Sequence, residues 1–388
     1  MTDAVTTTEG RDPIALPFDE TDMLARLRPW IECESPTYDP AAVSRMMDLA
    51  ARDMKAMGWE VEVIPGSGGF GSSVRAKVPH PDHGKVPGIM VSGHMDTVHP
   101  VGTLQKNPWR VENGTAWGPG IQDMKGGNFV MVEAARLIAQ AGWQTPLPIT
   151  FLFTPDEEVG TPATRGLIED EARKNAAVLL PEPALRNGDA VIGRFAIARF
   201  NLRTEGKPSH AGWLLKEGRS AIAEMARRIL EIEAMTSDDC TFSVGVIHAG
   251  KWVNCVSSTC DAEVLSMAKT QADLDGGVAA LKRLEGERNG VAFTVARGVT
   301  RPVWPLGQAG DQRLLAVAQG VAKRIGFQLG AQPSGGGSDG NFTGALGIPT
   351  LDSIGVRGEG LHTLGERIET ASLVERGKLA AGLFMGIR

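Results

Sequence analysis

Acidic side chains and a histidine follow three apolar segments, at the point where each segment ends. His94 and Asp96 end the run MVSGHMD, Glu157 and Glu158 follow ITFLFTPD, and Glu182 follows AAVLLP. Such runs predict buried strands, and open α/β sheets bind ligands at the carboxyl ends of their strands. We therefore expect these five side chains to meet at one edge of a sheet.

A sixth acidic residue, Asp123, stands in the glycine-rich segment GPGIQDMKGG directly before a predicted helix. An aspartate there is also a common helix N-cap. Carboxylates gathered at one edge would raise each other's pKa unless a cation neutralised them. One histidine and several oxygens suit a pair of divalent metal ions.

A near-symmetric pair of metal ions needs a second histidine. His362, in GEGLHTLGE, follows the late apolar segment IPTLDSIG, so it can reach the same edge. From spacing alone, we assign structural roles in loops, turns or a sandwich to the remaining histidines, which are His80, His83, His99, His210 and His248.

The order of the predicted elements indicates an α/β domain that is split by an insertion. Residues 1–192 and 304–388 alternate short apolar strands with helices, which predicts a mixed, mostly parallel sheet flanked by helices. Residues 193–303 follow the order β-α-β-β-α-β of a ferredoxin-like α+β domain.

Composition limits the partners. The 388 residues are 42% hydrophobic and carry a formal net charge of -6 without long basic runs. This predicts a small molecule or short peptide as substrate, and neither nucleic acid nor membrane as partner. The first twenty residues lack the features of a secretory signal, so we expect a cytoplasmic protein. We read the four cysteines as free thiols, with a Cys255–Cys260 pair as the alternative.

Seven motifs carry a family resemblance. In chain order, HMDTV, GPGIQDMKGG, PDEEVGT, PEP, GKPSHAG, GGGSD and LHTLGE resemble those of the M20 metallopeptidases. This family includes glutamate carboxypeptidases, aminoacylases, acetylornithine deacetylase and succinyl-diaminopimelate desuccinylase. The resemblance covers nearly the whole chain from about Leu24, and it is strongest to the bacterial glutamate carboxypeptidases.

The resemblance implies a zinc-exopeptidase fold and two divalent metal ions that share one aspartate. Zinc is the metal we expect, with cobalt or manganese as alternatives. The ligands that the resemblance implies are His94, Asp123 and Glu182 for one ion and Asp123, Glu158 and His362 for the other. It also implies that Asp96 orients His94 and that Glu157 is the general base for metal-activated water. The peptide bond between Asp123 and Met124 is expected to be cis.

For the inserted domain, the resemblance implies a lid through which two chains form a homodimer. His210 would stabilise the oxyanion of the reaction, often from the neighbouring subunit. Arg301 is our candidate to bind the substrate's carboxylate, with Asn254 and Arg194 as further candidates.

The sequence departs from the family at two places. Ser257 and Met267 stand where a proline and an arginine are usual, which weakens the assignment of the carboxylate-binding residues. Ala190 or Val191 occupies the place of a lysine that would favour a glutamate side chain. Specificity for glutamate is therefore in doubt.

We expect a carboxypeptidase that hydrolyses an amide bond next to a free carboxylate and releases a C-terminal amino acid. The alternative is a deacylase of N-acyl amino acids whose acyl group is apolar or aromatic. In that case Trp213, Trp252 and Trp304 would line the pocket for the acyl group. A non-catalytic binding protein is the third possibility. It is disfavoured because Glu157 and all five metal ligands are present.

Overall fold

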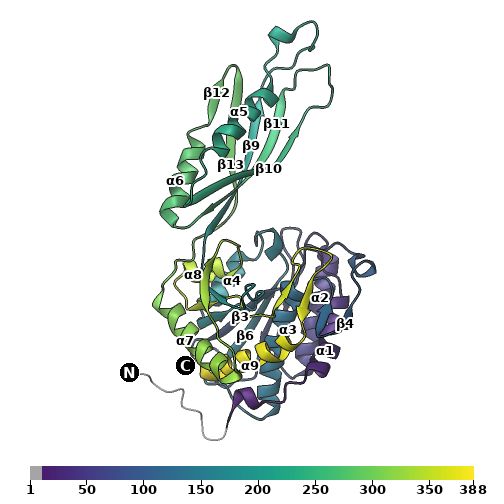
Figure 1. Ribbon diagram of the computed structural model, residues 1–388, viewed down its shortest axis with the longest axis vertical. Helices are drawn as coiled ribbons and strands as arrows, with labels where there is room; N and C mark the ends of the chain where they lie inside the picture. Colours follow the sequence, from purple (N-terminus) through teal and green to yellow (C-terminus); the bar gives the residue numbers. More distant parts are fainter. Residues whose placement is uncertain (1–10) are drawn as a thin grey trace. The chain divides into compact units, whose positions relative to one another are not determined.

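The computed structural model describes residues 11–388 and divides the chain into two compact units (Figure 1). The large unit contains the residues up to Gly193, Leu306–Pro333 and Ser338–Arg388, and the small unit contains Arg194–Pro305 and Ser334–Gly337. The expectation about the first twenty residues lies partly outside the described residues. Among residues 11–388, no helix has the length and apolar character that crossing a bilayer requires.

A six-stranded sheet in the order β1-β2-β6-β3-β7-β15 is the centre of the large unit. Strands β6, β3, β7 and β15 run parallel, and β2 runs antiparallel to both of its neighbours, β1 and β6. This confirms the mixed, mostly parallel sheet. The strands are β1 (Glu60–Ile64), β2 (Ser73–Lys77), β3 (Gly88–His94), β6 (Ile149–Thr154), β7 (Asn175–Leu179) and β15 (Thr350–Leu351).

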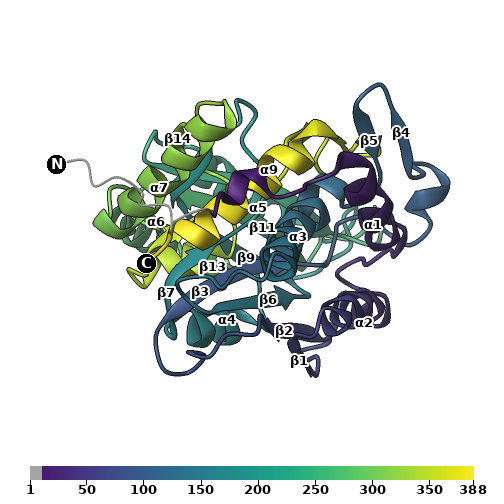
Figure 2. The same cartoon turned by 90° about the horizontal axis from the view of Figure 1, so that it is seen from below.

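Helices cover both faces of this sheet, which is why every residue of β3 and β6 is buried. Helices α3 and α9 pack against each other on one face, and α4 lies on the other (Figure 2). The helices of the large unit are α1 (Glu20–Glu32), α2 (Pro40–Ala56), α3 (Gly126–Gln140), α4 (Arg165–Ala172), α7 (Ala309–Ile325), α8 (Gly340–Ala345) and α9 (Ala371–Gly386).

Two smaller sheets and several short helical turns complete the large unit. One sheet pairs β14 (Ala331–Ser334) with β8 (Ala190–Arg194). The other has the order β16-β17-β5-β4, with β16 (Gly358–Glu359), β17 (Arg367–Glu369), β5 (Thr115–Trp117) and β4 (Arg110–Glu112). The short turns are η1 (Pro13–Ala15), η2 (Thr103–Gln105), η3 (Ile121–Lys125) and η4 (Glu157–Val159).

The small unit is an antiparallel sheet in the order β10-β11-β9-β13-β12 with two helices. Without the short β12, the chain order β9-α5-β10-β11-α6-β13 is the β-α-β-β-α-β order of a ferredoxin-like domain. Its elements are β9 (Ala196–Glu205), α5 (Ala221–Glu233), β10 (Cys240–Ala249), β11 (Thr259–Ala268), α6 (Gln271–Lys282), β12 (Gly286–Arg288) and β13 (Val291–Arg301), with the turn η5 (Leu215–Glu217).

Side chains along β9 and β11 alternate between buried and exposed, so one face of this sheet carries the core and the helices. The segment Ser334–Gly337 belongs to the small unit although the chain places it after the return to the large one. Two hydrogen bonds explain this: Phe195 N donates to Ser334 O at 3.0 Å, and Arg194 Nη1 donates to Gly336 O at 2.7 Å.

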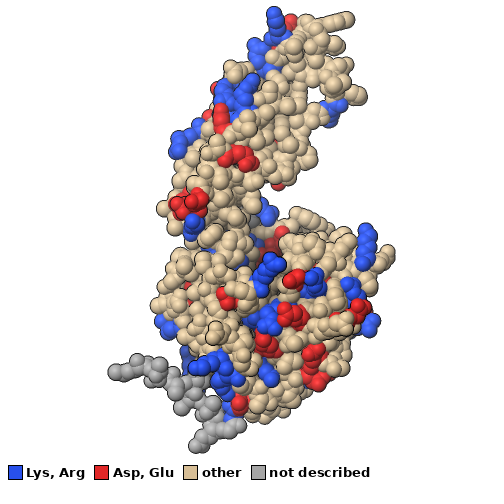
Figure 3. Space-filling model, viewed as in Figure 1, with Lys and Arg blue, Asp and Glu red and all other residues tan. Residues whose placement is uncertain are grey.

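Surface charge agrees with the composition. In the view of Figure 3, acidic and basic side chains are interspersed over the surface, and no continuous basic face is visible. All four cysteines are free, as predicted, and Cys255 is exposed whereas Cys260 is buried.

Candidate metal centre

The predicted edge of the large sheet brings the acidic residues and histidines together. Strand β3 ends at His94 and lies between the parallel strands β6 and β7. Glu157 and Glu158 form the turn η4 just after β6, and Glu182 follows β7. Because the three strands are parallel neighbours, their carboxyl ends deliver these side chains to one place.

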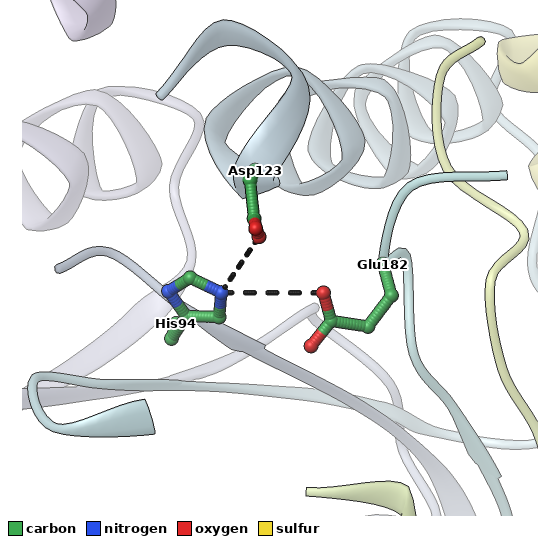
Figure 4. A group of neighbouring side chains, drawn as sticks. All are labelled: His94, Asp123 and Glu182. Carbon is green, nitrogen blue, oxygen red and sulfur yellow. Dashed lines mark hydrogen bonds and ion pairs between the residues drawn. The ribbon is translucent and has the colours of Figure 1, made fainter. Parts of the chain in front are cut away.

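The first group of candidate ligands contains His94, Asp123 and Glu182, whose ligand atoms lie within 4.8 Å of one another. His94 Nε2 is 3.2 Å from Asp123 Oδ1 and 4.0 Å from Glu182 Oε2 (Figure 4). On the far side of the ring, His94 Nδ1 lies 2.9 Å from the main-chain oxygen of Asp96. If Nδ1 carries the proton and donates it to this oxygen, Nε2 has a free lone pair that points toward Asp123 and Glu182.

The second group contains Asp123, Glu158 and His362, again with ligand atoms within 4.8 Å of one another. His362 Nε2 is 3.2 Å from Asp123 Oδ2 and 3.3 Å from Glu158 Oε2. Asp123 thus faces His94 with one oxygen and His362 with the other. A carboxylate in this position suits a bridge between two ions.

The electrostatics of the two groups fit cations. Burial raises the pKa of Glu158 to about 7 and raises the pKa of Glu182 well above its usual range. Hydrogen bonds to Asp123 and Glu158 raise the pKa of His362 to about 10. Moreover, the buried Glu158 Oε1 has no hydrogen-bond partner among the described residues. Nitrogen and oxygen donors in this arrangement fit two divalent ions.

Asp123 lies in the π-helical turn η3 that precedes α3. The peptide bond between Asp123 and Met124 is cis, which confirms that expectation. Burial by itself would raise the pKa of Asp123, but the hydrogen bonds with His362 and His94 outweigh it and hold this pKa below its usual range.

Asp96 lies behind the first group and is fully buried. Its carboxylate is 3.4 Å from His94 Nδ1 and accepts a hydrogen bond from Thr37 Oγ1 at 2.8 Å. It also accepts hydrogen bonds at 3.3 Å from the main-chain nitrogens of Glu157 and Glu158. One carboxylate therefore contacts both His94 and the turn that carries the two glutamates.

Glu157 belongs to neither ligand group. Its Oε2 lies 4.0 Å from His94 Nε2, so its carboxylate faces the space that the ligands surround. Adjacent glutamates of a single turn have thus taken different positions.

Sequence reasoning missed several residues that support this centre. Asn128 Nδ2 donates to His94 O at 2.7 Å, and its side chain also fills the space beside Gly93 where a Cβ would stand. Glu366 accepts hydrogen bonds from the main chain around Asp123. His99, for which we expected only a role in shaping its loop, is buried and contacts Glu366. The only sequence signal was the place of Glu366 in the motif LHTLGE.

The remaining candidates lie in the small unit, at opposite ends of its sheet. Arg194 and Arg301 are buried beside the segment Ser334–Gly337, and Arg301 pairs with Ile197 at the start of β9. His210 and Asn254 occupy exposed loops beyond the other end of β9, where Ala211 N donates to Asn254 O at 2.9 Å. The eight steps from Ile197 to Glu205 span roughly 26 Å.

The three tryptophans share no pocket in the small unit. Trp213 and Trp252 are 89% and 73% exposed in the loops near His210, whereas Trp304 is buried next to Arg194. The predicted acyl pocket of three tryptophans is therefore wrong for a single small unit.

Comparisons with known proteins agree with the fold. A family model described as "Peptidase family M20/M25/M40" matches residues 90–385. Carboxypeptidase G2 from Pseudomonas sp. (strain RS-16) is 30% identical over 383 residues, which cover 95% of this chain and 90% of that protein. A succinyl-diaminopimelate desuccinylase from Legionella pneumophila (strain Lens) is 25% identical, over 73% of this chain and 80% of that protein.

Among solved structures, the aminopeptidase PepT from Bacillus cereus ATCC 10987 superposes with a TM-score of 0.77 at 22% identity. The match covers 95% of this chain and 98% of that one. The chain therefore belongs to peptidase family M20. It is a hydrolase that acts on amide bonds, and the family uses divalent metals.

The two ligand groups predict separate losses of metal. Glu158→Ala removes a ligand from the second group only, so we expect one bound metal per chain in place of two, by elemental analysis after dialysis. Glu182→Ala removes a ligand from the first group only, so it should also leave one bound metal per chain. Two retained metals in either variant would contradict the assignment.

Proposed function

We propose that this protein is a dinuclear zinc carboxypeptidase that hydrolyses the amide bond before a C-terminal amino acid. The observation that carries the proposal is the Asp123 carboxylate between two ligand groups, with Glu157 beside them and outside both. Similarity to carboxypeptidase G2 along 95% of the chain supports the reaction class.

In this proposal, His94, Asp123 and Glu182 hold one ion, and Asp123, Glu158 and His362 hold the other. When bound, such ions lower the pKa of water and polarise a carbonyl oxygen. Glu157 takes a proton from the attacking water and returns it to the leaving amine. Asp96 keeps the His94 ring in the orientation that the site needs.

His210 has the hydrogen-bond geometry for a donor role. Its Nδ1 accepts hydrogen bonds from the main-chain nitrogens of Gly212 at 3.1 Å and Trp213 at 3.2 Å. A neutral imidazole that accepts at Nδ1 carries its proton on Nε2. We propose that this Nε2–H donates to the oxyanion that forms during hydrolysis.

His210 and Arg301 of one chain cannot both contact one small substrate. Arg301 pairs with Ile197 near the start of β9, whereas His210 lies beyond its end at Glu205, roughly 26 Å further along the strand. We therefore propose that the enzyme is a homodimer through its small unit, and that His210 and Asn254 act on the site of the neighbouring chain. Arg301 and Arg194 would then bind the carboxylate of the substrate within their own chain.

A second candidate function is the removal of an acyl group from an N-acyl amino acid. Ile197 of β9 pairs with Arg301 on one side and with Met267 on the other, so two apolar side chains follow the candidate carboxylate-binding arginine across the sheet. Ala190 and Val191 are fully buried and supply no lysine. Both features favour an apolar substrate side chain over that of glutamate.

A substrate panel tests these functions. The zinc-loaded protein should release free amine, measured with ninhydrin, from dipeptides or from N-acyl amino acids. If two metals are bound and no member of either set is hydrolysed, both proposed reactions are wrong. The proposed cytoplasmic location rests on the sequence alone.

A further inference from the structure

Glu366 is a fully buried acidic residue that belongs to neither ligand group. Its Oε2 accepts a hydrogen bond from Gly120 N at 2.8 Å and lies 2.6 Å from His99 Nε2. Its Oε1 accepts hydrogen bonds from Gln122 N at 2.8 Å and from Asp123 N at 3.0 Å. With His99 in the tautomer that donates to a carboxylate, each oxygen has two donors.

These contacts join the two loops that carry facing ligands. Three of the four donors are the main-chain nitrogens of Gly120, Gln122 and Asp123, at the start of the turn η3 that carries Asp123. Glu366 itself follows His362 in the same turn, where Glu366 N donates to Thr363 O at 3.3 Å. The side chain thus links the main chain at Asp123 to the loop of His362.

The pairing of strands holds Glu366 in this position. Arg367 begins β17 and pairs with Trp117 of β5, and Gly118 N donates to Glu366 O at 3.4 Å. The chain then runs from β5 directly into the loop of residues 118–123. The pairing of β17 with β5 brings the two segments close together. The Glu366 carboxylate then holds the main chain of residues 120–123 in place.

Only an acceptor at both oxygens satisfies this set of donors. A glutamine has one acceptor oxygen, and its NH2 group can only donate. In Glu366→Gln, that NH2 group would therefore face two donors instead of accepting from them. The substitution keeps the volume and the number of non-hydrogen side-chain atoms, so it removes the hydrogen bonds at one of the two oxygens without opening a cavity.

We propose that Glu366 is a positioning residue that sets the spacing between Asp123 and His362, and so the metal affinity of the centre. The proposal rests on the metal sites of the proposed function. Glu366 acts through the main chain of Asp123, and none of its hydrogen bonds named above reaches a ligand atom.

Metal titration tests this role directly. Apo Glu366→Gln, titrated with Zn²⁺ against a chromophoric chelator, should bind at least one of its two ions about ten- to a hundred-fold more weakly than the unsubstituted protein. Excess zinc should restore part of its turnover. A folded variant that binds both ions with unchanged affinity would overturn the proposal.

Glu133→Gln is the matched control. Glu133 is also a buried carboxylate, 2% exposed, and it lies on α3 about 10 Å along the helix from Gly126, the first residue. It forms ion pairs with Arg26 of α1 and Arg136 of α3. It should lose stability and keep its metal affinity. An equal loss of affinity in this control would show that any buried carboxylate has the effect, and would overturn the specific role.

His99→Leu covers the case in which Glu366→Gln fails to fold by circular dichroism. It removes one donor and leaves the three main-chain hydrogen bonds, so a several-fold loss of metal affinity is expected, and unchanged affinity would overturn the proposal. The titration needs no substrate. If the unsubstituted protein binds two ions but hydrolyses nothing, the proposed function fails while the role of Glu366 is still measured.

Discussion

Replacing Glu157 by glutamine should lower turnover by about 10²–10⁴-fold, the usual contribution of a general base. The amide of glutamine occupies the same volume but cannot accept the proton of the attacking water. Because Glu157 lies outside both ligand groups, Glu157→Gln should still bind two metals per chain. The measurements are kcat on a substrate from the panel and metal content by elemental analysis.

Its neighbour provides the contrast. Glu158→Gln replaces a candidate ligand in the second group, so we expect weaker metal binding as well as lower turnover. Metal loss in Glu157→Gln, or near-normal turnover with both metals bound, would reject the assignment of Glu157 as base. The adjacent glutamates thus allow one experiment to separate proton transfer from metal binding.

Replacing His210 by alanine should lower turnover by about 10²–10³-fold, as for other donors to an oxyanion. His210 belongs to the small unit, whereas both ligand groups lie in the large unit. Metal content should therefore stay at two per chain, because no ligand is altered. Normal turnover of His210→Ala would remove this histidine from the mechanism.

Mixing two inactive variants tests whether His210 acts on the neighbouring chain. In a heterodimer of Glu157→Gln and His210→Ala, one site combines an intact Glu157 with the intact His210 of the other chain. After subunit exchange, about one site in four should be active if His210 acts in trans, given random pairing of two chains. If it acts within its own chain, every site lacks one group and the mixture stays inactive.

The candidate centre was predictable because its residues follow strand ends. The sequence runs before His94, Glu157 and Glu182 are apolar enough to mark buried parallel strands, and such strands present their ends at one edge. The order of elements likewise indicated the ferredoxin-like insertion. Local hydrophobic patterns determine these features, so they can be predicted from the sequence.

The supporting contacts were not predictable in the same way. Glu366 lies 243 positions from Asp123 in the chain, and only the pairing of β17 with β5 brings its carboxylate to that loop. Similarly, the sequence assigned Arg301 and His210 to one substrate site, but the length of β9 places them far apart within one chain. Sequence spacing carries no information on such distances.

The sequence by itself determined which residue types are available for chemistry and at which strand ends they stand. The tertiary structure alone decided which oxygen of Asp123 faces which histidine, and that Glu157 stays outside both ligand groups. Glu157 and Glu158 are the same residue type, so the sequence alone does not distinguish their positions. They differ only because one turn directs a single carboxylate toward His362 and leaves the other beside His94.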